Sequence, residues 1–95
     1  MATSVTRNKR RAMLLRFLPR TTEEEEVDDL LKRYGKRTAE LAEMVRLYYG
    51  FGPDDPLTNR QMAEHFKCSL GTAARKRKIG LIRFKRWIET YRESA

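Results

Sequence analysis

The chain has 95 residues, with 21 Lys and Arg against 13 Asp and Glu, and a formal net charge of +8. This length suits one small domain, and the positive charge favours nucleic acid or another acidic surface as partner without determining the fold. No stretch is long and apolar enough to cross a membrane, and the single cysteine, Cys68, excludes an internal disulfide and a multi-cysteine zinc site.

The N-terminal segment is basic and precedes an acidic run. Residues 1–20 carry only positive charges, whereas 23–29 are almost wholly acidic. We interpret residues 1–21 as a basic arm that is either flexible or contains a short helix in the sequence MLLRFL. A second basic block follows from Lys67 to Arg92, with Glu89 as its only acid. Such blocks are usually solvated, but two basic blocks can also pair with the acidic run between them.

Two amphipathic helices are predicted in the middle of the chain. The first spans about 23–34 and begins with a capping box formed by Thr22 and Glu25. The second spans about 38–49, and a glycine follows each helix as a stop signal. Their apolar positions recur at spacings of three and four, and they are Val27, Leu30, Leu31, Tyr34, Leu41, Met44, Val45 and Tyr48.

A helix-turn-helix pattern follows the segment GFGPDDP, whose glycines and prolines cannot extend a helix. The third helix begins after Thr58, which forms a second capping box with Gln61. A short turn leads to Ser69, which caps a fourth helix that extends to about Arg92. Two helices joined by a short turn, the second strongly basic, are typical of a helix-turn-helix, whose second helix presents its first residues to the major groove. The expected fold is therefore all-α, a small bundle of four or five helices, with the domain at 22–92.

The segment LTNRQMAEHFKCSLGTAARKRKIGLIRF, Leu57 to Phe84, resembles region 4 of bacterial sigma factors. Upstream, EMVRLYYGFGPDDPLT is similar to that family's sequence of a glutamate, a leucine and a tyrosine-glycine pair before a loop and a leucine-threonine pair. The resemblance covers about residues 22–92. The matching positions are Glu43, Leu47, Tyr49, Gly50, Leu57, Thr58, Met62, Ala63, Phe66, Cys68, Ser69, Ala73, Leu81 and Phe84.

In sigma factors this module docks on the flap of the RNA polymerase beta subunit and inserts its last helix into the major groove of the minus-thirty-five promoter element. The family has Arg, Glu, Arg, Arg and Gln at its base-facing positions, so here only Arg75 keeps a long polar side chain that can read a base. Carried over to this chain, the base-facing positions are Leu70, Gly71, Thr72, Ala74 and Arg75.

Further positions are expected to contact phosphate, because cations that neutralise phosphates supply sequence-independent affinity. The alternative for them is a merely solubilising surface. The phosphate candidates are Thr58, Arg60, Lys67, Lys76, Arg77 and Lys78. The candidates for contact with polymerase are Leu41, Met44, Val45 and Tyr48.

The aromatic residues and the lone histidine have a structural explanation as well as a functional one. Helical spacing favours core packing over base stacking for Tyr48, Tyr49, Phe51, Phe66, Phe84 and Trp87. His65 is expected to pack or lie at the surface, and Cys68 to behave as a small buried hydrophobe.

The sequence therefore predicts a cytoplasmic transcription regulator resembling an isolated sigma region 4, with RNA polymerase core and double-stranded DNA as partners. One alternative is a protein-binding module that kept the fold without specific DNA readout. Another is a basic RNA-binding protein whose two basic blocks hold the RNA. No enzyme, cofactor, metal, membrane or small-molecule substrate is expected, because the sequence shows no nucleophile-base pair and no phosphate-cradling glycine loop.

Overall fold

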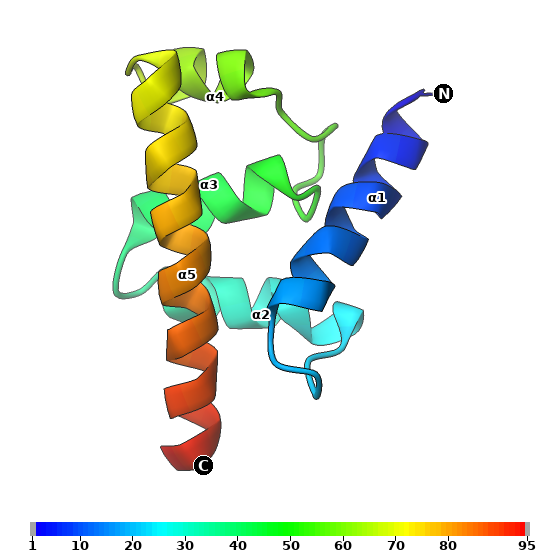
Figure 1. Cartoon of the computed structure of the whole chain (residues 1–95), viewed down its shortest axis with the longest axis vertical. Coiled ribbons are helices and arrows are strands. Elements are labelled where there is room, and N and C mark those ends of the chain that lie inside the picture. The colour runs from blue at the N-terminus through cyan, green and yellow to red at the C-terminus, as the bar shows by residue number, and fades with distance from the viewer. Residues whose placement is uncertain (1, 95) are drawn as a thin grey trace.

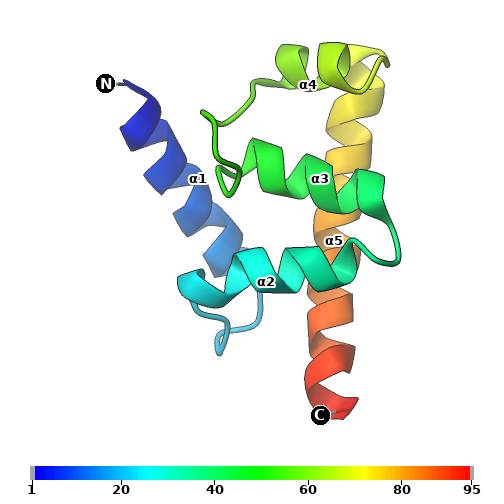
Figure 2. The ribbon, with the colours of Figure 1, turned by 180° about the vertical axis from the view of Figure 1, so that it is seen from behind.

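The computed structural model describes residues 2–94, which form five helices and no strand (Figure 1). The all-α expectation is confirmed, with five helices. In Figure 1, α2 and α3 lie side by side behind α1 and α5. α1 covers the end of this pair where α2 begins and α3 ends. α5 crosses the other end of the pair. Figure 2 shows the same arrangement from behind. The helices are α1 (Ala2–Phe17), α2 (Glu24–Tyr34), α3 (Ala39–Tyr48), α4 (Asn59–His65) and α5 (Leu70–Ser94).

The capping residues explain where the helices begin. Glu26 Oε1 accepts a hydrogen bond from the backbone N–H of Glu23 at 2.9 Å, so α2 starts one residue later than its sequence predicts. The expected box of Thr22 and Glu25 is wrong, because the backbone N–H of Thr22 donates to the Pro19 carbonyl in a turn and its side chain is buried.

The two other predicted caps are confirmed. Thr58 Oγ1 accepts from the backbone N–H of Gln61 at 3.1 Å, and Gln61 Oε1 accepts from the backbone N–H of Thr58 at 2.9 Å. Ser69 Oγ accepts from the backbone N–H of Thr72 at 3.1 Å. The first turns of both α4 and α5 are thus fixed by local hydrogen bonds, which satisfy backbone donors that a helix N-terminus leaves open.

The hydrophobic core has two parts. The larger part lies between α1, α2, α3 and α5, and the smaller part holds the helix-turn-helix against α3. The fully buried centre of the larger part includes Leu14, Val27, Leu31, Phe84 and Ile88. The smaller part consists of Met44, Met62, Ala63 and Ala73.

The N-terminal segment is part of this core. α1 is a helix of 16 residues, longer than the short helix that the sequence allowed. Its Leu14 and the following Leu18 are buried, and its arginines reach the loop after α3. Arg10 donates to the carbonyl oxygens of Tyr48 at 2.9 Å and Leu57 at 2.6 Å. Residues 2–21 therefore pack as part of the domain and do not form a separate arm.

Gly50 allows α1 to approach this loop closely. Arg11 Nε donates to the Gly50 carbonyl at 2.9 Å, and Arg7 Nη2 donates to the Asp54 carbonyl at 2.7 Å. The φ of Gly50 is 80°, in the region that favours glycine, and a Cβ there would lie 2.9 Å from Arg7 Cγ. The predicted stop of α3 at this glycine is confirmed, and the same residue makes room for α1.

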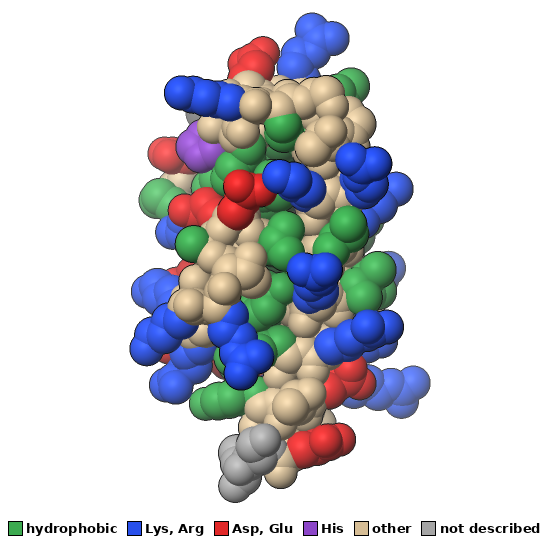
Figure 3. Space-filling view, turned by 90° about the vertical axis from the view of Figure 1, so that its left-hand side faces the viewer, with side chains coloured by type: hydrophobic (Ala, Val, Ile, Leu, Met, Phe, Trp, Pro, Cys, Tyr) green, Lys and Arg blue, Asp and Glu red, His purple; other side chains and the backbone are tan. Residues whose placement is uncertain are grey.

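Charges of opposite sign meet across the fold, which is one of the two alternatives that the alternating basic and acidic blocks left open. Arg11 of α1 lies 3.7 Å from Glu24, and Arg92 of α5 lies 2.5 Å from Glu26, so the acidic run pairs with both basic blocks. Many Lys and Arg side chains nevertheless remain on the face shown in Figure 3, where they alternate with hydrophobic surface.

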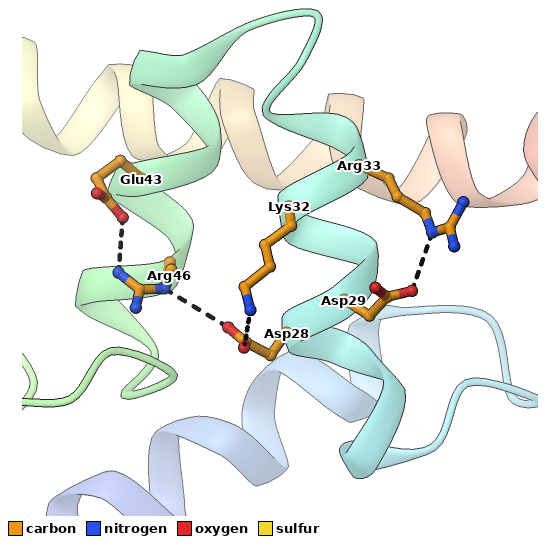
Figure 4. A network of polar contacts seen from close by, with 6 residues as sticks. All are labelled: Asp28, Asp29, Lys32, Arg33, Glu43 and Arg46. Atoms are coloured by element: carbon orange, nitrogen blue, oxygen red, sulfur yellow. Dashed lines mark hydrogen bonds and ion pairs between the residues drawn. The ribbon is translucent and has the colours of Figure 1, made fainter.

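A second set of ion pairs joins α2 to α3 (Figure 4). Arg46 of α3 reaches both Glu43, at 3.0 Å, and Asp28 of α2, at 3.5 Å. Lys32 also pairs with Asp28, at 3.4 Å. Because these side chains are partly exposed, each pair adds only about 0–1 kcal/mol to stability. They orient α2 against α3, and the apolar core holds the two helices together.

Candidate nucleic-acid interface

α4, the turn at Lys67 and Cys68, and the start of α5 form a helix-turn-helix. Lys67 has a φ of 53°, the left-handed conformation that lets the chain reverse direction between the two helices. Met62 and Ala63 of α4 pack with Ala73 of α5 and Met44 of α3, which fixes the angle of the pair. The turn and the inner faces are therefore where the sequence pattern placed them.

The first turn of α5 projects from this frame. Leu70 is 53% exposed, Gly71 and Arg75 are exposed, and no heavy atom lies within 4 Å of a Cβ built on Gly71. Thr72 and Ala74 are only partly exposed, and the Thr72 hydroxyl accepts a hydrogen bond from Ser69 at 2.8 Å. The exposed part of the predicted base-facing set is thus Leu70, Gly71 and Arg75.

Cations surround this tip. Arg60, Lys67, Arg75 and Lys78 are exposed, and none of them forms an ion pair among residues 2–94. Unpaired, flexible cations at the start of a recognition helix can bind phosphate oxygens without first giving up an internal partner. Four positions with these properties belong to the predicted interface.

Two of the other phosphate candidates have partners within the fold. Lys76 Nζ lies 2.9 Å from Glu40 Oε1, and this hydrogen-bonded carboxylate raises the pKa of Lys76. Thr58 is exposed, but its hydroxyl caps α4. To bind a phosphate, Lys76 would have to give up its ion pair with Glu40. Thr58 would have to contact DNA while its hydroxyl keeps the hydrogen bond that caps α4.

Arg77 is not available to a phosphate, and its assignment as a phosphate contact is wrong. Its side chain is 8% exposed, and Nη1 donates to the Tyr49 hydroxyl at 3.1 Å. The guanidinium carbon lies 3.8 Å from the centre of the Tyr48 ring, over which Arg10 also lies, at 4.2 Å. Arg77 points inward because position 77 lies on the same face of α5 as the core residues Ala73 and Phe84.

Tyr49 shows how this buried cation affects its surroundings. Burial raises the pKa of the Tyr49 hydroxyl, and the positive charge of Arg77 opposes the increase. The neutral hydroxyl remains the hydrogen-bond acceptor for Arg77 at ordinary pH. The tyrosines and arginines of this cluster join α1, α3 and α5, a structural use that charge counting in the sequence did not reveal.

The polymerase candidates on α3 also face inward. Met44 and Val45 are fully buried, so their assignment to an exposed docking surface is wrong. Leu41 and Tyr48 are partly exposed, but Leu41 packs against Gly80 and Tyr48 lies beneath two guanidiniums. The apolar stripe of this helix serves the core, because α5 and α4 cover it.

The remaining single residues have local explanations. His65 packs edge-on against Phe66, with ring centres 4.7 Å apart, and Cys68 is a free, partly buried thiol. Within residues 2–94 no group of three or more His, Cys, Asp or Glu side chains is arranged to hold a metal. None of the described helices is long and apolar enough to cross a membrane.

Comparisons with known proteins add no relative. No protein-family model matches the chain, and searches of the curated proteins and of the solved structures return no match. Support for a function therefore comes from the helix-turn-helix and its motif alone.

Proposed function

We propose that this protein is a transcription regulator that binds double-stranded DNA through α4 and α5 and resembles an isolated sigma region 4. The most direct support is the exposed tip of α5, where Leu70, Gly71 and Arg75 project beside cations that have no internal partner. A tip with one long polar side chain reads few base edges, so phosphate contacts provide most of the affinity. A protein with this function acts in the cytoplasm, where bacterial polymerase acts.

Charge-neutralising substitutions at the tip test this interface. We expect Arg75→Gln and Arg60→Gln each to weaken binding to a promoter-type duplex by about 5- to 100-fold, because each removes about 1–3 kcal/mol of contact energy. Arg16→Gln on α1 is the matched control, since this exposed arginine lies outside the helix-turn-helix. Electrophoretic mobility shifts measure all three; equal weakening by the control would exclude a localised interface.

RNA polymerase core is the second partner that we propose, and it rests on the family resemblance alone. The burial of Met44 and Val45 means that contact with the beta flap would use a surface other than the one assigned to α3. A pull-down with core polymerase in the presence of nuclease tests this part. Retention of polymerase supports direct contact, and loss on nuclease treatment shows that DNA bridged the two proteins.

The RNA-binding alternative uses the two basic blocks to hold the RNA. In the first block Arg7, Arg10 and Arg11 donate to backbone carbonyls after α3, which leaves fewer cations for RNA. We therefore favour duplex DNA over RNA.

A further inference from the structure

A groove with three arginines lies away from the helix-turn-helix. It runs between the α2–α3 connection and the C-terminal half of α5, encloses about 550 Å³, and lies among residues that carry no negative charge. We call it the arginine groove. Its lining residues are Tyr34, Arg37, Thr38, Arg83, Arg86, Trp87, Thr90 and Tyr91.

Aromatic rings form one wall of this groove. Trp87 and Tyr91 are stacked, with ring centres 5.0 Å apart and planes 13° apart, and Tyr91 remains 38% exposed. Tyr34 lies 5.7 Å from Trp87 at a tilted angle. A planar ligand can extend such a stack, and base-aromatic stacking tolerates any base because every base has a π-face. Trp87 also stacks with the buried Phe84, with ring centres 6.3 Å apart, so the core packing that the sequence favoured for Trp87 is present and the exposed end of the stack is Tyr91.

Tyr34 shows that the groove contains an unused polar group. The residue is 3% exposed, and its hydroxyl has no hydrogen-bond partner among the described residues. Burial raises the pKa of this hydroxyl, and the nearby charge of Arg83 opposes the increase. Buried hydroxyls in folded proteins normally have a partner, so this one needs an explanation, and a ligand held by Arg83 would supply the missing partner.

The arginine groove lies too far from the tip of α5 for its residues to enter the same major groove of DNA as that tip. Arg83 follows Leu70 by 13 positions in one continuous helix, which places it about 20 Å along the axis at 1.5 Å per residue. A recognition helix contacts base edges with the residues near its N-terminus, and Arg83 lies well beyond those residues. A ligand of the arginine groove is therefore separate from the duplex bound at the tip.

We infer that the arginine groove binds a nucleotide unit, with its phosphate held by Arg37, Arg83 and Arg86 and its base against Trp87 and Tyr91. Guanidiniums match phosphate oxygens in geometry as well as in charge, and aromatic planes match a base. The unit can come from a free mononucleotide or from a single strand of nucleic acid. An acidic peptide would satisfy the arginines but would make no use of the stacked rings.

The single tryptophan of the chain reports on this site directly. Because Trp87 is the only tryptophan and lines the groove, a stacked base quenches its fluorescence. ATP and a short single-stranded oligothymidylate are titrated separately, with inorganic phosphate and polyglutamate as charge-only probes. We expect saturable quenching by at least one nucleotide probe and none by the charge-only probes. Saturation by ATP identifies a mononucleotide site, whereas saturation by the oligonucleotide alone identifies a strand site.

Substitutions test whether the quenching ligand binds in the arginine groove. We expect Arg83→Gln to raise the Kd about tenfold, as loss of one charge-assisted contact predicts, and Arg16→Gln to leave it unchanged. Circular dichroism melting checks that both variants fold. Arg75→Gln, which weakens duplex binding if the proposed function is correct, leaves this Kd unchanged, so the two proposals fail independently. Absent quenching, equal quenching by polyglutamate, or equal weakening by Arg16→Gln would overturn the inference.

Discussion

At the scale of single residues, neighbouring cations of α5 have opposite roles. Arg77 is buried against Tyr48 and Tyr49, whereas Lys78 is exposed and forms no ion pair among residues 2–94. From the sequence, both were predicted to contact phosphate. Composition alone cannot show which side of the helix faces the core when that side contains a cation. A tyrosine ring and a hydroxyl make burial of Arg77 tolerable by supplying cation-π and hydrogen-bond partners.

Replacement of these neighbours separates the two roles. Arg77→Ala removes a hydrogen bond and a stacked guanidinium, so we expect the free energy of unfolding to fall by about 2 kcal/mol. Lys78→Ala should change it by less than about 0.5 kcal/mol, as for other exposed positions. Urea unfolding measures both. A stable Arg77→Ala protein that has lost only DNA affinity would show that Arg77 serves the interface after all.

At the scale of helices, local signals predicted well and long-range contacts did not. Apolar spacing predicted the approximate bounds of α2 to α5, and the caps at Thr58 and Ser69 were also correct, because these signals depend on neighbours within four positions; the cap of α2 was assigned one residue too early. α1 was harder, because its arginines bond to carbonyls 38 to 47 residues away and its sequence shows no sign of those acceptors. Apolar spacing also could not distinguish a core face of α3 from a docking face, since both need the same residues.

Two glycines of α5 test the packing of this helix. Gly71 is exposed with open space around it, so Gly71→Ala should stabilise the protein by about 0.5 kcal/mol through helix propensity. At Gly80 a Cβ would lie 3.3 Å from both the Cβ and the carbonyl oxygen of Leu41. The backbone oxygen cannot move easily, so Gly80→Ala should lower the melting temperature while Gly71→Ala raises it. Similar increases for both would contradict the close crossing of α3 and α5.

At the scale of the whole molecule, which has a net charge of +8, some Lys and Arg side chains bond within the fold and others remain at the surface for a ligand. Arginines of α1 hold the loop before α4, and Arg92 pairs with α2, so these cations position the helix-turn-helix without touching its ligand. Other cations lie at the tip of α5 and in the arginine groove, and exposed cations such as Arg16 lie at neither place. The sequence predicted the tip, but the groove combines residues from two distant segments that only the fold brings together.

The docking of α1 has a direct test in two adjacent residues. Leu14 is fully buried and Met13 is 51% exposed. We expect Leu14→Ala to lower the free energy of unfolding by about 3 kcal/mol, because it leaves a cavity, and Met13→Ala to have little effect. Equal, small effects in urea unfolding would mean that residues 1–21 form an independent arm.

The central claim is that the tip of α5 binds duplex DNA chiefly through phosphates. The most direct measurement is the affinity for a labelled promoter-type duplex by fluorescence anisotropy across about 50 to 200 mM salt. With Arg60, Lys67 and Lys78 as phosphate contacts and Arg75 at a base edge, log affinity should fall against log salt with a slope of about −3. Absence of binding at the lowest salt, or a slope near zero, would contradict the claim.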